Sequence, residues 1–169
     1  MDMKKSYQIV LIVLAGLIFY FNRQLGLSLD RIDNLLNRES GLLGVSGVSN
    51  DMRQIIENSK KGNERCQLAM EMFAFQIKKY IGAYAAAMGG IDVLVFTAGI
   101  GENSPLTRAM ICQGLEFLGI KLNETENSET AAVEQTISQS HSKVKVMVIP
   151  TNEERMIALD TIALAFPSK

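Results

Sequence analysis

Two matching segments in the second half of the chain constrain the fold more than any other feature. Residues 91–104 read IDVLVFTAGIGENS and residues 144–154 read VKVMVIPTNEE, so each is an apolar run of strand length that leads directly into a helix start. An almost continuous apolar run is typical of a strand covered on both faces, as in α/β proteins with parallel strands. The two segments therefore predict an α/β fold with helices packed over a sheet.

The corner after the first of these strands carries Gly99 and Gly101, with Ser104 and Pro105 placed to be the N-cap and the first residue of a helix. Ligands of open α/β sheets bind beyond the carboxyl ends of the strands, and helix N-termini attract phosphate groups. Two interpretations stay open at this point. The glycines either make a tight turn or allow a nucleotide to approach the backbone.

The corner after the second strand contains the sequence TNEE. Thr151 and Glu154 match a capping box, in which the threonine is the N-cap and the glutamate bonds back to it. This arrangement leaves Glu153 without a structural task. Glu153 either complements the helix dipole or serves as an oxygen ligand for Mg²⁺ that accompanies a nucleotide.

The segment SGVSNDMR offers a second candidate binding loop. Either Asp51 caps a helix and forms a surface ion pair with Arg53, or Arg53 lies against the edge of an adenine or ribose, where its planar fork can stack and donate. The rest of the pattern predicts helices over residues 27–40, 63–88 and 151–166, a short helix that begins at Asp51, a glycine-rich loop over 41–53, and a polar surface excursion over 121–143.

The helix over residues 63–88 is the strongest of these predictions. It contains no proline, and its polar residues form a narrow stripe, so we expect it to be buried over most of its surface and to end at Gly89 and Gly90. Residues 9–21 are a different kind of apolar run. They have no polar side chain, yet they are shorter than the roughly 20 residues of a spanning helix. A buried helix, a membrane or signal segment, and a non-native chain end all remain open for them.

Composition excludes several function classes. The 169-residue chain has a formal net charge of −1 and no basic stripe, which argues against nucleic acid as a partner. Cys66 and Cys112 lack metal-ligand spacing and are expected to be reduced core thiols. His141, the single histidine, lies in a polar segment that predicts a surface loop, which leaves no base for a Ser-His-Asp hydrolase.

Four segments taken together resemble the carboxy-terminal domain of acetate kinase: SGLLGVSGVSNDMR, IKKYIGAYAAAMGGIDVLVFTAGIGENS, CQGLEFLGIKLN and VIPTNEE. They follow one another in the family's order, from about residue 25 to 164. The resemblance implies one domain of the actin, sugar kinase and Hsp70 ATPase type, with a mixed sheet flanked by helices. It assigns residues 25–169 to this domain and leaves residues 1–24 as an atypical apolar segment.

The resemblance also implies an activity, the interconversion of ATP and acetate with ADP and acetyl phosphate, and Mg²⁺ as cofactor. It implies a cytoplasmic homodimer that does not insert into a membrane. Its binding residues fall into three groups. The adenosine site would be lined by Asp51, Met52 and Arg53, the turn under the nucleotide would be Gly99, Ile100, Gly101, Glu102 and Asn103, and the Mg²⁺ ligand would be Glu153.

The sequence departs from the family in what it lacks. In the family, two active-site arginines (one of which binds acetate), a metal-binding asparagine, a catalytic aspartate and a transition-state histidine all lie upstream of the matched region. None has a counterpart here, so we assign no catalytic residue to this chain and expect acetate to bind only together with the missing amino-terminal domain. Two alternatives are a non-catalytic remnant that dimerises or binds nucleotide, and a membrane-tethered module.

Overall fold

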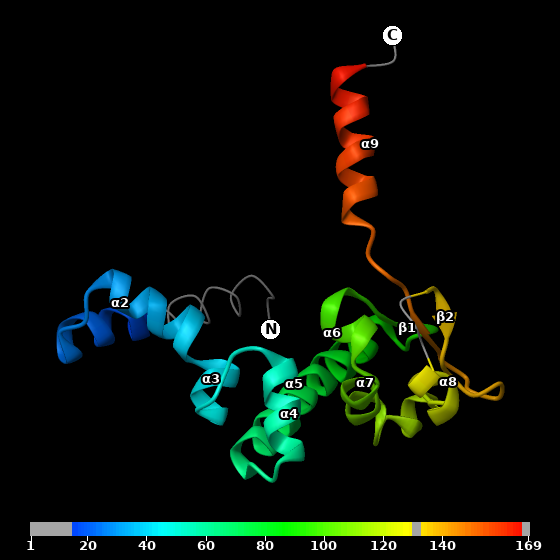
Figure 1. The fold of residues 1–169 in the computed structure, drawn as a ribbon, viewed down its shortest axis with the longest axis horizontal. Coiled ribbons are helices and arrows are strands. Elements are labelled where there is room, and N and C mark those ends of the chain that lie inside the picture. The colour runs from blue at the N-terminus through cyan, green and yellow to red at the C-terminus, as the bar shows by residue number, and fades with distance from the viewer. Residues whose placement is uncertain (1–14, 130–132, 167–169) are drawn as a thin grey trace. The chain divides into compact units, whose positions relative to one another are not determined.

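A computed structural model describes residues 15–129 and 133–166 of the chain (Figure 1). The chain divides into two compact units, Met1–Met70 and Glu71–Lys169. Helix α5, Glu64–Met88, runs through the division between them. The division therefore falls inside a helix, and the boundary expected at residues 24 and 25 stays a prediction.

The first unit consists of short helices. After a helical stretch over residues 15–25 come α2 (Leu29–Asn34), the π-helical turn η1 (Leu35–Glu39), α3 (Gly41–Ser46) and α4 (Met52–Lys60). The N-caps are those that the sequence predicts, because Ser28 accepts from the Arg31 N–H and Asp51 from the Arg53 N–H. The buried apolar residues of this unit are Ile32, Met52, Ile55, Cys66, Ala69 and Met70.

Helix α3 corrects the prediction of a continuous loop over residues 41–53. Gly41 and Gly47, with φ of +61° and +67°, stand at the two ends of the helix, where the left-handed conformation that favours glycine is needed. The Arg65 side chain, from α5, donates to the Val45 carbonyl at 2.9 Å and the Gly44 carbonyl at 3.2 Å. These long-range bonds satisfy carbonyls at the end of α3, and no local pattern in the segment predicts them.

Helix α5 ends at the residue that the sequence predicts and begins one residue later than predicted, and Gly89 and Gly90 follow it with φ of +77° and +137°. The expected burial is wrong. Ala74 is buried and Ile77 and Ile81 pack against the core of the second unit, but much of the remaining apolar surface is open. The exposed large side chains are Leu68, Met72, Phe75, Tyr80, Tyr84 and Met88.

The second unit contains a small mixed sheet, as the fold class requires. In the described residues its strands are β1 (Val93–Phe96), β2 (Gln135–Thr136) and β3 (Lys145–Val148), in the order β1-β3-β2. Strand β1 runs parallel to β3, and β2 runs antiparallel to it. One face of this sheet, with Phe96, Val146 and Val148, packs into the core cluster that also contains residues of α5 and α7.

The other face of the sheet is open, which corrects the prediction of a strand covered on both sides. Val93 and Val95 point to this face because side chains alternate along a strand, and they are 47% and 43% exposed. Strand β1 also stands at the edge of the sheet. The apolar run was interpreted correctly as a strand, but the described part of the chain provides no layer over its second face.

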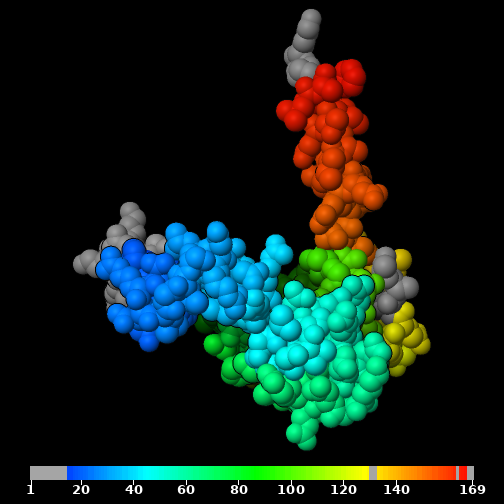
Figure 2. Space-filling view, turned by 60° about the vertical axis from the view of Figure 1, so that its left-hand side comes forward, coloured from blue at the N-terminus to red at the C-terminus, as the bar shows by residue number. Residues whose placement is uncertain are grey.

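Helices follow both parallel strands. After β1 come α6 (Ala98–Asn103), α7 (Pro105–Cys112), the 3₁₀ turn η2 (Glu116–Leu118) and α8 (Glu124–Glu129), and after β3 comes α9 (Glu153–Ala165). Ser104 caps α7 with Pro105 in the first turn, as the sequence predicts. The exposed large apolar residues of the α9 region are Met156, Ile157, Leu159, Ile162, Leu164 and Phe166, and Figure 2 shows the red end of the chain uncovered along its visible length.

The polar segment over residues 121–143, predicted to lie on the surface, contributes to both the sheet and the core. It supplies β2, and Ile137 beside it is 0% exposed in the core cluster. The Ile137 N–H donates to the Val146 carbonyl at 2.8 Å, which extends the pairing with β3. His141 lies in an exposed turn of this segment, as predicted.

The apolar run over residues 9–21 is only partly described, because residues 9–14 lie outside the described residues. Residues 15–25 are helical, and Leu17, Ile18, Phe19 and Tyr20 are 39% to 59% exposed, so this part is not the buried helix that was one of the alternatives. No helix among residues 15–129 and 133–166 is both long enough and apolar enough to cross a membrane.

The core position of Ile137 gives a first prediction. Ile137→Ala should lower the free energy of unfolding by about 2–5 kcal/mol, because it removes buried methyl groups and leaves a cavity. Val133→Ala in the same segment is the matched control, since Val133 is 57% exposed. Urea unfolding followed by circular dichroism measures both, and equal effects would mean that the segment contributes no core.

Candidate functional site

The two strand-to-helix corners lie at the same edge of the sheet. Phe96 and Val148 are register partners in the parallel pair β1–β3, and the Ile149 N–H donates to the Phe96 carbonyl at 2.9 Å. The carboxylate of Glu102, in α6, then joins the two corners. Its Oε1 accepts from the Thr151 N–H at 2.8 Å and from the Thr151 hydroxyl at 3.1 Å. The segments on either side of this bond, 97–103 and 149–153, form the candidate site.

The backbone of the first corner is a short helix rather than the glycine turn that the sequence suggests. It begins at Ala98, whose φ of +58° is the one positive value among the described residues other than glycine. This conformation costs an alanine on the order of 1–2 kcal/mol. Strain of this kind persists only where the surroundings hold it, and it gathers at functional sites. Gly99 and Gly101 do not have positive φ, so their small size needs another explanation.

The five residues expected under a nucleotide divide into two groups. Three have tasks within the protein. A Cβ on Gly101 would lie 3.2 Å from the Phe96 carbonyl carbon, Glu102 holds Thr151, and the Asn103 amide donates to the Gly99 carbonyl at 2.9 Å. Gly99, in contrast, has nothing within 4 Å of its Cβ position, and Ile100 is 37% exposed. The surface that a ligand can reach is therefore the main chain around Gly99.

Arg108 holds this corner in place, and the sequence analysis did not single it out. It is 0% exposed. Its Nη1 donates to the Gly101 and Glu102 carbonyls, both at 2.8 Å, while Nε and Nη2 donate to the side chain and the main chain of Asn127 at 2.7 Å. Its position in the sequence could have revealed the burial. Residues three and four apart lie on the same face of a helix, and Arg108 precedes the buried Ile111 and Cys112 of α7 by three and four residues.

Burial also sets the protonation of this region. Desolvation lowers the pKa of Arg108 from its ordinary value, although arginine remains charged at physiological pH. Burial raises the pKa of the neighbouring Cys112 thiol to about 12, so the thiol is protonated and unreactive at neutral pH. Cys112 and Cys66 are both free and buried, as the sequence predicts.

The second corner corrects the predicted capping box. The N-cap of α9 is Asn152, whose side chain accepts from the Arg155 N–H at 3.0 Å. The Thr151 hydroxyl is engaged with Glu102 instead. Glu153 and Glu154 are thus the first two residues of α9, and both are exposed. Within residues 15–129 and 133–166, no group of three or more His, Cys, Asp or Glu side chains could hold a metal ion.

The other candidate loop belongs to the first unit. Asp51 caps α4, and its carboxylate also accepts from the Arg53 guanidinium, with an Nη2–Oδ2 distance of 2.7 Å. The hydrogen bond from Arg53 lowers the pKa of the Asp51 carboxyl. The Arg53 side chain is 90% exposed in this pair, while Met52 is 4% exposed and belongs to the core of the first unit.

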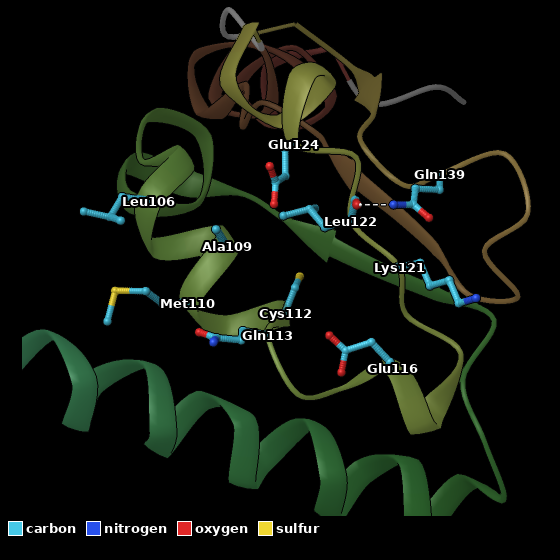
Figure 3. Close-up of a pocket in the computed structure, with 10 residues that line it drawn as sticks. All are labelled: Leu106, Ala109, Met110, Cys112, Gln113, Glu116, Lys121, Leu122, Glu124 and Gln139. Atoms are coloured by element: carbon cyan, nitrogen blue, oxygen red, sulfur yellow. Dashed lines mark hydrogen bonds between the residues drawn. The ribbon is translucent and has the colours of Figure 1, made fainter.

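Two cavities in the second unit differ in their relation to the corners. One, of about 290 Å³, is lined by α5 and by Phe96, Thr97, Ile100 and Gly101 at the end of β1. The other, of about 530 Å³, lies between α7 and residues 116–124 and contains none of the predicted binding residues. Figure 3 shows Glu116 and Glu124 approaching it from opposite sides, with the Cys112 sulfur between them. The second cavity is larger, but none of the residues predicted to bind nucleotide or Mg²⁺ lines it.

Comparison with known proteins decides the family. A model of the acetokinase family matches residues 13–159. The chain belongs to the acetokinase family. It is 55% identical over 139 residues to the acetate kinase of Heliobacterium modesticaldum, which covers 82% of this chain and 34% of that relative. This is the family that the four sequence segments resemble.

Solved acetokinase structures agree with this assignment. The crystal structure of Porphyromonas gingivalis acetate kinase matches with a TM-score of 0.80 and 50% identity, over 89% of this chain and 38% of that one. A propionate kinase from Francisella tularensis matches with a TM-score of 0.74 and 38% identity, over 85% and 36%. The chain therefore spans about a third of the length of the relatives it matches.

The Arg108 contacts give a second prediction. Arg108→Leu should lower the free energy of unfolding by roughly 4 kcal/mol, because four accepting oxygens lose their donors in the interior at about 1 kcal/mol each. Arg38→Leu is the control, since Arg38 is exposed. Chemical denaturation of both variants measures the difference, and a loss no larger than that of the control would contradict the role given to Arg108.

The Glu102–Thr151 link gives a prediction about pH. The hydrogen bond from the Thr151 backbone N–H lowers the pKa of Glu102, so folding favours the charged carboxylate. The stabilisation is present above the unfolded-state pKa of about 4.3 and is lost as pH falls through the lower folded-state value. Wild type should melt at a higher temperature than Glu102→Gln at pH 7, and the gap should close toward about pH 3. A gap that is independent of pH would exclude the carboxylate charge as its cause.

Proposed function

We propose that this chain is the carboxy-terminal, nucleotide-binding part of an acetate kinase. The observation that supports this most directly is the pair of strand-to-helix corners at the carboxyl edge of β1 and β3, joined by Glu102 and Thr151. In open α/β sheets this edge is where ligands bind. Membership of the acetokinase family supplies the class of reaction, transfer of a phosphoryl group between ATP and a small carboxylate.

Each candidate residue then has a defined part in binding. The exposed main chain around Gly99 and Ile100 is proposed to lie under the phosphates, because the other three residues of the corner are engaged within the fold. Asp51, Met52 and Arg53 are proposed for the adenosine. Arg53 would have to exchange its contact with Asp51 for the nucleotide, which is feasible because an exposed ion pair contributes little stability.

Glu153 is proposed as the protein ligand of Mg²⁺. The donor set fits that ion, since Mg²⁺ in kinases is held by one or two carboxylates together with the substrate phosphates and water, and needs no cage of protein ligands. Glu153 stands at the start of α9, exposed, beside the corner that Glu102 holds. The ion would neutralise charge on the phosphates, and this chain would supply one carboxylate toward it.

The complete reaction needs groups beyond those assigned here. Phosphoryl transfer depends on positioning and on cationic groups around the transferred phosphoryl. Arg108 is buried in structural contacts, and Arg53 is the one arginine in a candidate binding loop. We therefore propose that this chain by itself binds nucleotide but does not turn over acetate, and that the intact enzyme is a cytoplasmic homodimer, as the family resemblance implies.

Nucleotide binding gives the fourth prediction. Isothermal titration with ATP and Mg²⁺ should show weak, millimolar binding, and Gly99→Val should abolish it because the side chain would occupy the proposed phosphate surface. Gly82→Val in α5 is a matched control, since both glycines are helical and have nothing within 4 Å of the Cβ position. Gly101→Val is unsuitable, because its side chain would clash with the Phe96 backbone.

The same titration tests the metal ligand. Glu153→Gln should remove the increase in ATP affinity that Mg²⁺ produces, while the neighbouring substitution Glu154→Gln should leave it in place. Both residues are exposed, so neither variant should change the melting temperature by more than a degree or two. Equal ATP affinity of the Gly99→Val and Gly82→Val variants would contradict the proposed phosphate surface. Loss of the Mg²⁺ effect in Glu154→Gln alone would show that Glu154, and not Glu153, is the metal ligand.

A further inference from the structure

The loop between α3 and α4 is organised by the hydroxyl of Ser46, the last residue of α3. Ser46 is 2% exposed. Its Oγ accepts from the Val48 N–H at 3.1 Å and from the Ser49 N–H at 3.3 Å, and it donates to the Ser49 carbonyl at 3.2 Å. A serine hydroxyl has one donor and two acceptor positions, so these three bonds use its full capacity. The side chain therefore holds the main chain of two residues that belong to no helix or strand.

A second hydroxyl continues this network to the residues proposed for adenosine. The Ser49 Oγ accepts from the Asp51 N–H at 3.0 Å. The Asp51 carboxylate in turn accepts from the Arg53 N–H at 2.9 Å and from the Arg53 guanidinium at 2.7 Å. A continuous path of hydrogen bonds thus runs from Ser46 through Ser49 and Asp51 to Arg53.

The helices on either side of the loop have anchors of their own. The Arg65 guanidinium donates to two carbonyls in the last turn of α3. At the other end, Met52 and Ile55 of α4 are 4% and 0% exposed. Val48 and Asn50 of the loop itself are exposed, so packing contributes little to the path of the loop. Removal of the Ser46 hydroxyl should therefore loosen the loop and leave both helices folded.

We propose that Ser46 is a positioning residue for the nucleotide, because its hydroxyl holds residues 47–50 in the path that presents residues 51–53 to adenosine. This inference rests on the proposed function, in which residues 51–53 line the adenosine site. Without the hydroxyl, two N–H groups and one carbonyl lose their partner, and buried polar groups need partners. Ser49 is buried, so its unpaired groups would reach water only by a movement of the loop, and Ser49 carries the bond to the Asp51 N–H.

This role predicts a loss of affinity that is confined to the nucleoside end of the ligand. The phosphates are proposed to lie over the main chain around Gly99, and the adenosine against residues 51–53. A displaced loop changes only the second of these contacts. A purely structural role of Ser46 would instead lower the fraction of folded chain, which weakens the binding of every ligand by the same factor.

The test compares ATP with inorganic tripolyphosphate, which has a chain of three phosphates and no nucleoside, each with Mg²⁺. Isothermal titration uses the full 169-residue chain. Ser46→Ala should reduce the preference for ATP over tripolyphosphate at least fivefold and leave the affinity for tripolyphosphate unchanged. Ser40→Ala is the matched control, since the Ser40 Oγ also forms hydrogen bonds, to the Leu35 and Leu36 carbonyls, at the opposite end of α3. This control should keep the preference.

Two further measurements separate positioning from stability. In an Arg53→Ala background, Ser46→Ala should have little additional effect on the preference for ATP, because residues that act through one network are not additive. Without nucleotide, hydrogen exchange at the Val48 and Ser49 amides should be at least tenfold faster in Ser46→Ala and unchanged in Ser40→Ala. Slow exchange at these amides in Ser46→Ala would contradict the role given to its hydroxyl.

Circular dichroism establishes that each variant is folded. If Ser46→Ala does not fold, Ser49→Ala takes its place in the titrations, since it removes the bond to the Asp51 N–H and leaves the contacts of the Ser46 hydroxyl with the main chain. It should reduce the preference for ATP in the same direction.

Three titration results would overturn the proposal, and each has a different meaning. A wild-type chain that binds ATP no better than tripolyphosphate would contradict the adenosine site itself, and with it this part of the proposed function. A wild-type chain that prefers ATP, with a Ser46→Ala variant that keeps the preference, would contradict the role of Ser46 alone. Equal losses for ATP and tripolyphosphate in Ser46→Ala would show that the hydroxyl stabilises the fold and does not position the nucleotide.

Discussion

The interaction on which the candidate site depends is the buried guanidinium of Arg108. It donates to the Gly101 and Glu102 carbonyls in α6 and to both the side chain and the main chain of Asn127 in α8. All four acceptors are uncharged carbonyl or amide oxygens. The buried positive charge of Arg108 is therefore balanced by hydrogen bonds and not by an ion pair. A lysine could not replace it, because one ammonium group cannot reach two segments with a rigid planar fork. The corner after β1 is therefore held by a residue that is itself fully buried.

This fixed corner explains how the site can offer main chain to a ligand. Gly101 is needed for close packing against Phe96, and the side chains of Glu102 and Asn103 form hydrogen bonds within the protein. What remains on the outside is the strained Ala98 and the backbone of Gly99. Backbone groups held rigidly at the carboxyl edge of a sheet are suited to phosphate, which accepts hydrogen bonds from any well-oriented N–H.

In the described residues the two faces of the sheet differ in burial. A core forms on the side where α5 and α7 meet β1 and β3, and there the valines of β3 are fully buried. On the other side Val93 and Val95 keep nearly half of their surface exposed. The chain spans about a third of the length of the relatives it matches.

Local chemistry in the sequence determined the elements themselves. The helix from Glu64 to Met88, the strands around Leu94 and Val146, and the cap at Ser104 all follow from periodicity and from hydrogen bonds that span a few residues. The family follows from the four segments read together. Tertiary structure decided what each residue does, because those choices depend on partners far along the chain. Thr151 has the local sequence of a helix cap, but Glu102, 49 residues earlier, takes its hydroxyl, so capping passes to Asn152.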